Sequence, residues 1–464
     1  MSTSNRSADT EHQRVDIERA DVDCLKQWDK DHVWHAFTQM AEYEPLIIES
    51  AQGAWLKTVD GQRLLDGASS LWCNVLGHRH PRLDAAISDQ LGKVAHVTNL
   101  GVSNPTTIRL AVKLLQVAPA SLECVFFSGD GASAVEVALK MVVQFWRQNS
   151  QPQRRRFIAL GGAYHGDTVG CVSVGGIARL RDPFDSMLFD VIHGPCPDAF
   201  RLPNGVQPEQ ACAHYVDEYR KLLDKHAGEI AAVIVEPLMQ CAAGMVQQPA
   251  GFISGLRQLT ADRDILLIVD EIAVGMGRSG KMWACQWENV EPDLMCIGKG
   301  LSGGYMPMAA TLTSRRVWDA FLGTHQESRA FLHGHTYGGN PLGAAVSLAT
   351  LQIFEDERTL DRVLELSKAL AECLRALSDH PHVGNIRICG LIAAIDLVGS
   401  RLPRQEFASI DRRGVAVCDV ARQHGVWLRP LGNIVPLVPP LCISPAEIKL
   451  LVDAVSHGIE AATN

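Results

Sequence analysis

The stretch that decides the fold reads ILLIVDEIAVGMGRSG at residues 265–280 and resumes as PDLMCIGKGLSGGY at residues 292–305. Each part contains an apolar run that is too short for a helix and that ends in polar or glycine residues, which is typical of strands buried in a parallel sheet. Similar runs occur at 122–127, 157–160 and 231–235. We therefore expect an α/β fold with a mostly parallel central sheet.

A helix is expected directly after the first of these runs. Beyond the glycine turn at Gly131, apolar residues recur at helical spacing at Val135, Leu139, Val142 and Trp146. Sheets whose strands alternate with helices bind ligands beyond the carboxyl ends of the strands. We therefore expect the functional side chains at those ends.

The domain organisation follows from length and from a change of pattern near residue 345. A chain of 464 residues exceeds what one hydrophobic core usually holds. A long helical region follows residue 345, and strand-like pieces occur at 386–398, 426–428 and 434–438. We predict an N-terminal segment (1–75) that contributes to a small domain and to the active site, a large cofactor-binding domain (76–345) and a C-terminal small α+β domain (346–464).

Composition excludes several kinds of partner. The formal net charge of −9 argues against nucleic acid, and the short basic run at 154–156 is expected to be solvated. The 13 cysteines show no Cys-x-x-Cys spacing, so we expect reduced thiols and no metal site. The N-terminal stretch is polar through about Asp31, and no apolar run approaches the roughly 18 residues of a membrane span. We expect a cytoplasmic protein.

The strongest chemical signal is the pair formed by Asp270 and Lys299, each placed after a buried strand. A carboxylate at such a position is costly unless it meets a cation or a protonated nitrogen. A pyridinium ring supplies that nitrogen, and a ring kept protonated is an electron sink for transamination. The lysine would form the resting Schiff base and then move the proton. The pair predicts a pyridoxal 5′-phosphate enzyme, although each residue alone has an ordinary structural explanation.

Three further residue groups support this interpretation. Gly131 and Ala132 stand where a strand turns into a helix, and their N–H groups would hold a phosphate. Tyr164, in GGAYHG at 161–166, would stack on a flat ring. Glu236 follows a strand and would orient a loop or tune the cofactor hydroxyl.

Together these motifs resemble the class III aminotransferases of the type I pyridoxal-phosphate fold, from about Trp34 onward. The resemblance implies that Lys299 carries the cofactor, that Asp270 pairs with its ring nitrogen, that Gly131 and Ala132 hold its phosphate, and that Tyr164 covers its ring. It also implies a homodimer with active sites at the subunit interface. The matching phosphate-site threonine from the partner subunit would be Thr336, in HGHTY at 333–337.

Three stretches resemble one branch of this class, the diaminopelargonate synthases of biotin biosynthesis: HVWHAFTQM at 32–40, SSLWCNV at 69–75 and GVWLRP at 425–430. These enzymes aminate the ketone of 8-amino-7-oxononanoate by a ping-pong reaction. Because that acceptor is a polymethylene chain with a remote carboxylate, it needs an apolar tunnel closed by a cation. The resemblance assigns Phe37 and Trp72 to the wall, Arg429 to the carboxylate, and Tyr164 and Gly334 to further substrate contacts.

The amino donor is the least determined part of the prediction. The resemblance implies S-adenosylmethionine, but this chain has Leu71-Trp72 where such enzymes often carry paired tryptophans, and Phe37 where they carry a tyrosine. The SLWCNV and HGHT wording also resembles relatives that use lysine. Lysine is therefore the alternative donor. Ala132 replaces a common serine, which removes one side-chain hydrogen bond to phosphate but leaves the backbone donors.

Three alternative functions fit these residues less well or less specifically. Another class III enzyme, such as an ornithine-type or ω-amino acid aminotransferase or an aminomutase, would share every cofactor motif. A nicotinamide dehydrogenase is disfavoured because no Gly-x-Gly-x-x-Gly turn follows an early strand with an acidic residue some 20 positions on. A non-catalytic scaffold would have no need of Lys299, Asp270 and Arg429 together.

Overall fold

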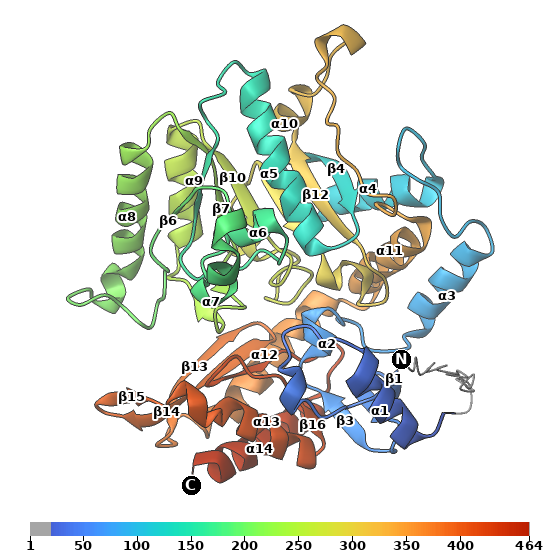
Figure 1. Cartoon of the computed structure of the whole chain (residues 1–464), viewed down its shortest axis with the longest axis vertical. Coiled ribbons are helices and arrows are strands. Elements are labelled where there is room, and N and C mark those ends of the chain that lie inside the picture. The colour runs from blue at the N-terminus through green and yellow to red at the C-terminus, as the bar shows by residue number, and fades with distance from the viewer. Residues whose placement is uncertain (1–19, 464) are drawn as a thin grey trace, which may run out of the picture.

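The computed structural model describes residues 20–463, so the first part of the polar N-terminal stretch lies outside the described residues. A seven-stranded sheet forms the large upper body in Figure 1. Its strands, in spatial order, are β4 (Leu122–Ser128), β12 (Ala309–Ser314), β11 (Leu294–Ile297), β10 (Leu266–Asp270), β7 (Ile230–Val235), β5 (Arg156–Ala159) and β6 (Val191–His193). Only β12 runs antiparallel to its neighbours in this sheet. The expected α/β fold with a mostly parallel sheet is confirmed, whereas β6 and β12 were not predicted.

Helices cover both faces of this sheet because successive strand residues point to opposite sides. On β10, Leu266 and Ile268 pack in one hydrophobic cluster with α5 (Gly131–Gln148), while Leu267 and Val269 belong to the cluster that includes α9 (Phe252–Asp262). The indole of Trp146 on α5 donates to the Ala231 carbonyl across 2.8 Å. This bond fixes α5 against the middle of the sheet.

The C-terminal part forms the lower body in Figure 1, together with blue N-terminal segments. Its strands are β13 (Val383–Cys389), β14 (Ile392–Arg401), β15 (Arg404–Glu406) and β17 (Ile434–Leu437), and its helices are α12 (Thr359–Arg375), α13 (Arg413–Gln423) and α14 (Pro445–Thr463). The strand-like piece expected at 386–398 is a hairpin, not one strand. Gly390, with φ +62°, makes its turn where a Cβ would meet the Arg278 carbonyl at 2.3 Å.

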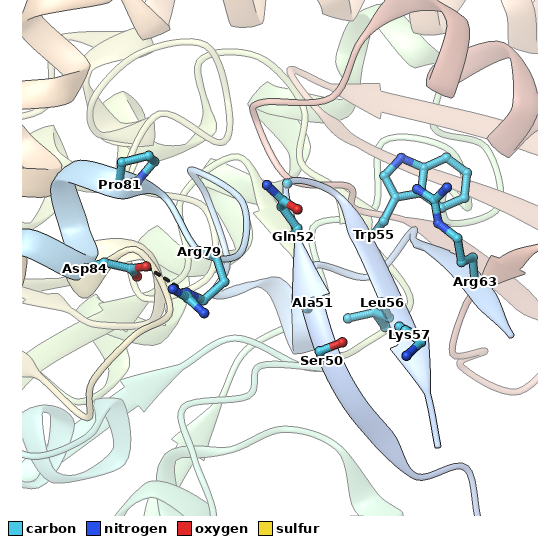
Figure 2. Close-up of a pocket in the computed structure, with 11 residues that line it drawn as sticks. Ser50, Ala51, Gln52, Trp55, Leu56, Lys57, Arg63, Arg79, Pro81 and Asp84 are labelled. Carbon is cyan, nitrogen blue, oxygen red and sulfur yellow. Dashed lines mark hydrogen bonds and ion pairs between the residues drawn. The ribbon is translucent and has the colours of Figure 1, made fainter. Parts of the chain in front are cut away.

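The N-terminal segment shares a sheet with C-terminal residues. Strands β1 (Ile48–Gln52), β2 (Trp55–Thr58) and β3 (Arg63–Asp66) form an antiparallel series, and β16 (Val426–Trp427) pairs in parallel with β3. An open groove of about 860 Å³ lies over β1 and β2. Figure 2 shows the Arg63 guanidinium beside the Trp55 ring, 5.0 Å from its centroid, and the Arg79–Asp84 ion pair. The exact domain boundaries stay predictions.

The remaining regular elements complete the chain. They are α1 (Val22–His32), α2 (Ser69–Trp72), α3 (Pro81–Leu91), α4 (Pro105–Val117), α6 (Val169–Val174), α7 (Ala178–Arg181), α8 (Ala211–Lys225), β8 (Met239–Gln240), β9 (Val246–Gln247), α10 (Arg315–Asp319) and α11 (Pro341–Asp356). Within residues 20–463, no helix has the length and apolar character needed to cross a membrane. All 13 cysteines are free thiols.

Candidate active site

Asp270 and Lys299 open onto one pocket of about 440 Å³. Asp270 ends β10, and the parallel pairing sets it opposite Cys296 on β11, so the chain reaches Lys299 just beyond the neighbouring strand end. Gly298 lies against the start of α5, where a Cβ would be in ordinary van der Waals contact, 3.5 Å from the Gly131 Cα. Lys299 then begins a 3-10 turn that extends to Ser302, and its φ of +39° lies in the left-handed region.

The carboxylate of Asp270 is buried and held from two sides. Its Oδ2 lies 2.7 Å from His165 Nδ1, and its Oδ1 accepts the Ile272 backbone N–H across 3.0 Å. An ionised carboxylate only accepts hydrogen bonds, so Nδ1 of His165 carries the proton at this contact. The other ring nitrogen of His165 is buried and has no partner among the described residues. The arrangement fixes the orientation of the Asp270 carboxylate toward the pocket.

The N-terminus of α5 borders the same pocket and offers backbone donors. The Asp130 side chain caps this helix by accepting the Ser133 N–H across 2.8 Å. The N–H groups of Gly131 and Ala132 have no acceptor within the described part of the chain. A Cβ at Gly131 would approach the Ile272 side chain to 2.9 Å, so this close strand–helix connection requires glycine. Two donors and the positive helix end favour an anion here.

Tyr164 and Glu236 form the opposite border. The buried Glu236 carboxyl accepts the Tyr164 backbone N–H across 3.0 Å, and burial raises the pKa of Glu236 to about 7. The Tyr164 hydroxyl donates to Asp167 across 2.7 Å, and burial followed by this bond raises its pKa. The phenol therefore stays protonated at neutral pH, and Tyr164 lines the pocket.

A second pocket of about 360 Å³ continues from Lys299. Its apolar lining includes Phe37, Leu71, Trp72 and Leu180, and its cations besides Lys299 are Arg179 and Arg429. The amine of Lys299 lies 5.5 Å from the centroid of the Trp72 ring, which lines both pockets. Arg429 donates to the Phe37 carbonyl across 3.2 Å. The pocket thus combines a primary amine and two guanidinium groups with a largely apolar lining.

Two candidates lie elsewhere. Gly334 and Thr336 are exposed and line neither of these pockets of their own chain. Sequence reasoning also missed two residues. His165 stands beside Tyr164 in the quoted motif and would have been found by asking what could hold Asp270. Arg179 gave no signal, because a lone arginine on a short helix resembles any surface residue.

The pocket around Lys299 fits pyridoxal 5′-phosphate. It presents a primary amine, a buried carboxylate whose orientation is fixed, an aromatic side chain and a helix N-terminus with two N–H groups that have no acceptor in the described chain. These are the four groups that an aldehyde, a pyridine nitrogen, a flat ring and a phosphate respectively require.

Comparisons with known proteins agree with this geometry. The family model described as "Aminotransferase class-III" matches residues 38–459. The adenosylmethionine-8-amino-7-oxononanoate aminotransferase of Geobacter sulfurreducens is 45% identical, covering 96% of this chain and 99% of its own. The crystal structure of the enzyme of that name from Methanocaldococcus jannaschii matches with a TM-score of 0.90 at 38% identity, over 95% of this chain and 99% of the other. The ω-transaminase of Pseudomonas jessenii in complex with PMP matches with a TM-score of 0.90 at 31% identity, over 95% and 98% of the two chains.

Proposed function

Because the chain belongs to the class III aminotransferases, which use pyridoxal 5′-phosphate, we propose that it transfers an amino group to the ketone of 8-amino-7-oxononanoate, giving 7,8-diaminononanoate for biotin synthesis. The names of its relatives support this acceptor. The single observation that carries the proposal is that Lys299 and Arg429 line one pocket whose other lining residues are largely apolar. The amine and the guanidinium suit the two functional groups of the acceptor, a ketone and a remote carboxylate.

Each residue around the cofactor pocket has a separate role. When bound, the cofactor supplies an aldehyde for the amino group and a ring that accepts electrons. Asp270, whose orientation His165 fixes, places a negative charge where it stabilises a proton on a facing nitrogen. Nζ of Lys299 takes the proton from the substrate carbon and returns it, since this amine stands where both pockets meet. Gly131 and Ala132 bind the anionic group through backbone N–H donors.

Substrate binding falls to the second pocket. Phe37, Leu71 and Trp72 offer apolar surface against which a polymethylene chain can pack. Arg429 binds the remote carboxylate, for which a planar guanidinium offers paired donors. Glu236 holds the Tyr164 backbone and thereby the aromatic wall.

The proposed donor is S-adenosylmethionine, which the names of the relatives support. Lysine is the second candidate, because Phe37 presents no hydroxyl and Leu71 no indole to the pocket. Both donors act through the same amine-accepting site, so the spectrum of the bound cofactor reports which one reacts.

We also propose a homodimer in which Thr336 and Gly334 reach the partner's active site. Both lie away from the pockets of their own chain. Exposed apolar side chains on α3, α4 and the segment between them support a covered face: Leu91, Leu100, Val102, Ile108 and Val112. Thirteen free thiols favour a reducing compartment, so a cytoplasmic location stays our prediction.

The test is a reaction with defined substrates. Purified protein loaded with pyridoxal 5′-phosphate is mixed with 8-amino-7-oxononanoate and either S-adenosylmethionine or lysine, and mass spectrometry follows 7,8-diaminononanoate. We expect product over many turnovers with one donor and none from Lys299→Ala. Absence of product with both donors, while other amino acceptors are converted, would overturn the proposed acceptor.

A further inference from the structure

The turn that carries Trp72 has an unusual backbone. Four consecutive residues have left-handed φ values: Ser69 (+48°), Ser70 (+47°), Leu71 (+66°) and Trp72 (+71°). None is glycine, and residues with a Cβ disfavour this conformation. Single left-handed residues are common in turns, but a run of four needs compensation from its surroundings.

Ser69 is held by the Val438 carbonyl and by Arg278, and the rest of the compensation comes from Asp66, a fully buried carboxylate at the end of β3. Its Oδ1 accepts the backbone N–H groups of Ala68 (3.3 Å) and Ser70 (3.0 Å). Its Oδ2 accepts the Ser70 hydroxyl (3.0 Å) and faces His78 Nε2 at 3.1 Å. Because β3 pairs with both β2 and β16, the carboxylate is fixed before the turn begins.

The turn at 69–72 determines where the side chains of Leu71 and Trp72 lie in the substrate pocket. The Trp72 N–H donates to the Ala68 carbonyl across 2.8 Å and closes the turn. Leu71 and Trp72 then face the substrate pocket, with the Trp72 ring 5.5 Å from the Lys299 amine. Asp66 itself lines neither pocket.

We propose that Asp66 is a positioning residue for substrate selection: by holding residues 69–72 in a left-handed turn, it sets Leu71 and Trp72 against the chain of the acceptor. The identity of that acceptor rests on the proposed function, whereas the positioning does not. Leu71 and Trp72 line the pocket assigned to the acceptor chain and carry no group that takes part in proton transfer, so their misplacement weakens binding more than turnover.

A matched pair of substitutions at Ser70 separates backbone strain from the hydrogen bond. Ser70→Ala and Ser70→Gly both lose the hydroxyl contact to Asp66, but glycine adopts the left-handed conformation freely. We expect KM for 8-amino-7-oxononanoate to rise about fivefold in Ser70→Ala and at most about twofold in Ser70→Gly, with kcat within about threefold in both. Equal KM values in the two variants would overturn the proposal.

Asp66→Asn removes the charge and one acceptor. We expect KM to rise about tenfold in Asp66→Asn, with kcat changed less than about threefold. Trp72→Phe should raise KM in the parent enzyme. In the Asp66→Asn variant, the same Trp72→Phe substitution should cause almost no further rise in KM. Additive effects of the two substitutions would contradict positioning through Trp72. Where Asp66→Asn fails to fold, the Ser70 pair carries the test.

A readout without activity separates this inference from the proposed function. In cofactor-free protein, the fluorescence difference between a variant and its Trp72→Phe counterpart reports Trp72 alone among the nine tryptophans. We expect acrylamide to quench this difference signal at least about twice as strongly in Ser70→Ala as in the parent, with Ser70→Gly between them. Unchanged quenching would refute the positioning role, whereas failure of the parent to aminate 8-amino-7-oxononanoate would refute only the function.

Discussion

Replacing Arg429 by alanine tests the proposed carboxylate-binding residue of the substrate pocket. The Arg429 guanidinium makes one protein hydrogen bond, to the Phe37 carbonyl, and no ion pair within the described residues, so it is available to a carboxylate. A hydrogen bond to a charged group contributes about 1.5–3 kcal/mol. Because Arg429 is only half-buried, solvent screening favours the lower end, about 1.5–2 kcal/mol. At about 1.4 kcal/mol per factor of ten, Arg429→Ala should lower kcat/KM for 8-amino-7-oxononanoate about 10- to 30-fold.

The assay compares that acceptor with its methyl ester and with a short 2-oxo acid. The ester lacks the negative charge, so kcat/KM of the parent enzyme for the ester should be about as low as that of Arg429→Ala for the acid. Arg429→Ala should have nearly equal kcat/KM values for the acid and the ester. Arg429→Lys is the matched control, since it keeps the positive charge but loses the paired N–H donors of the guanidinium. Its kcat/KM for the acid should lie between those of the parent and of Arg429→Ala. An equal loss for the acid, the ester and the short oxo acid would refute the role of Arg429 in carboxylate binding.

Three further predictions concern the cofactor pocket and the sheet beneath it. Asp270→Asn removes the buried charge beside His165 and should lower kcat at least about 100-fold while the fold is kept, as steady-state kinetics and circular dichroism would show. Burial raises the pKa of Glu236 to about 7, so the folded cofactor-free protein holds this proton more tightly than the unfolded chain does. The free energy of unfolding should therefore fall as the pH rises from about 4.5 to about 7. Urea titrations at several pH values should show a smaller fall in Glu236→Gln. Trp146→Phe leaves the buried Ala231 carbonyl without its indole donor and opens a small cavity, so urea unfolding should show a loss of about 2–4 kcal/mol, and a loss below about 0.5 kcal/mol would contradict the packing of α5 described above.

The central strands were predictable because their side chains are buried on both faces. The run at 265–269 is apolar throughout and is followed by Asp270 and Glu271, so the boundaries of β10 were visible in the sequence to within a residue. Strand β12 (Ala309–Ser314) was missed because it begins with two alanines, which are disfavoured in strands, and contains no continuous run of large apolar residues. Its antiparallel direction depends on tertiary pairing with β4 and β11, which local sequence does not encode.

The candidate site also has a part that the sequence predicts and a part that it does not. Asp270 and Lys299 stand at strand ends, where sheet geometry brings distant residues together, and their shared pocket follows from register. The His165 contact to Asp270 and the left-handed turn at 69–72 depend on side-chain and backbone angles that no periodicity reports. Arg179 reaches the substrate pocket only because α7 (Ala178–Arg181) packs beside it.

The most direct test of the account is the covalent bond between the cofactor and the chain. Purified protein is loaded with pyridoxal 5′-phosphate, reduced with borohydride, digested and mapped by mass spectrometry. We predict that the added mass lies on Lys299 alone, and that a productive amino donor supplied before reduction prevents the labelling. Labelling of another lysine, or sustained turnover by Lys299→Ala, would contradict the assignment of Lys299 as the residue that carries the cofactor and moves the proton.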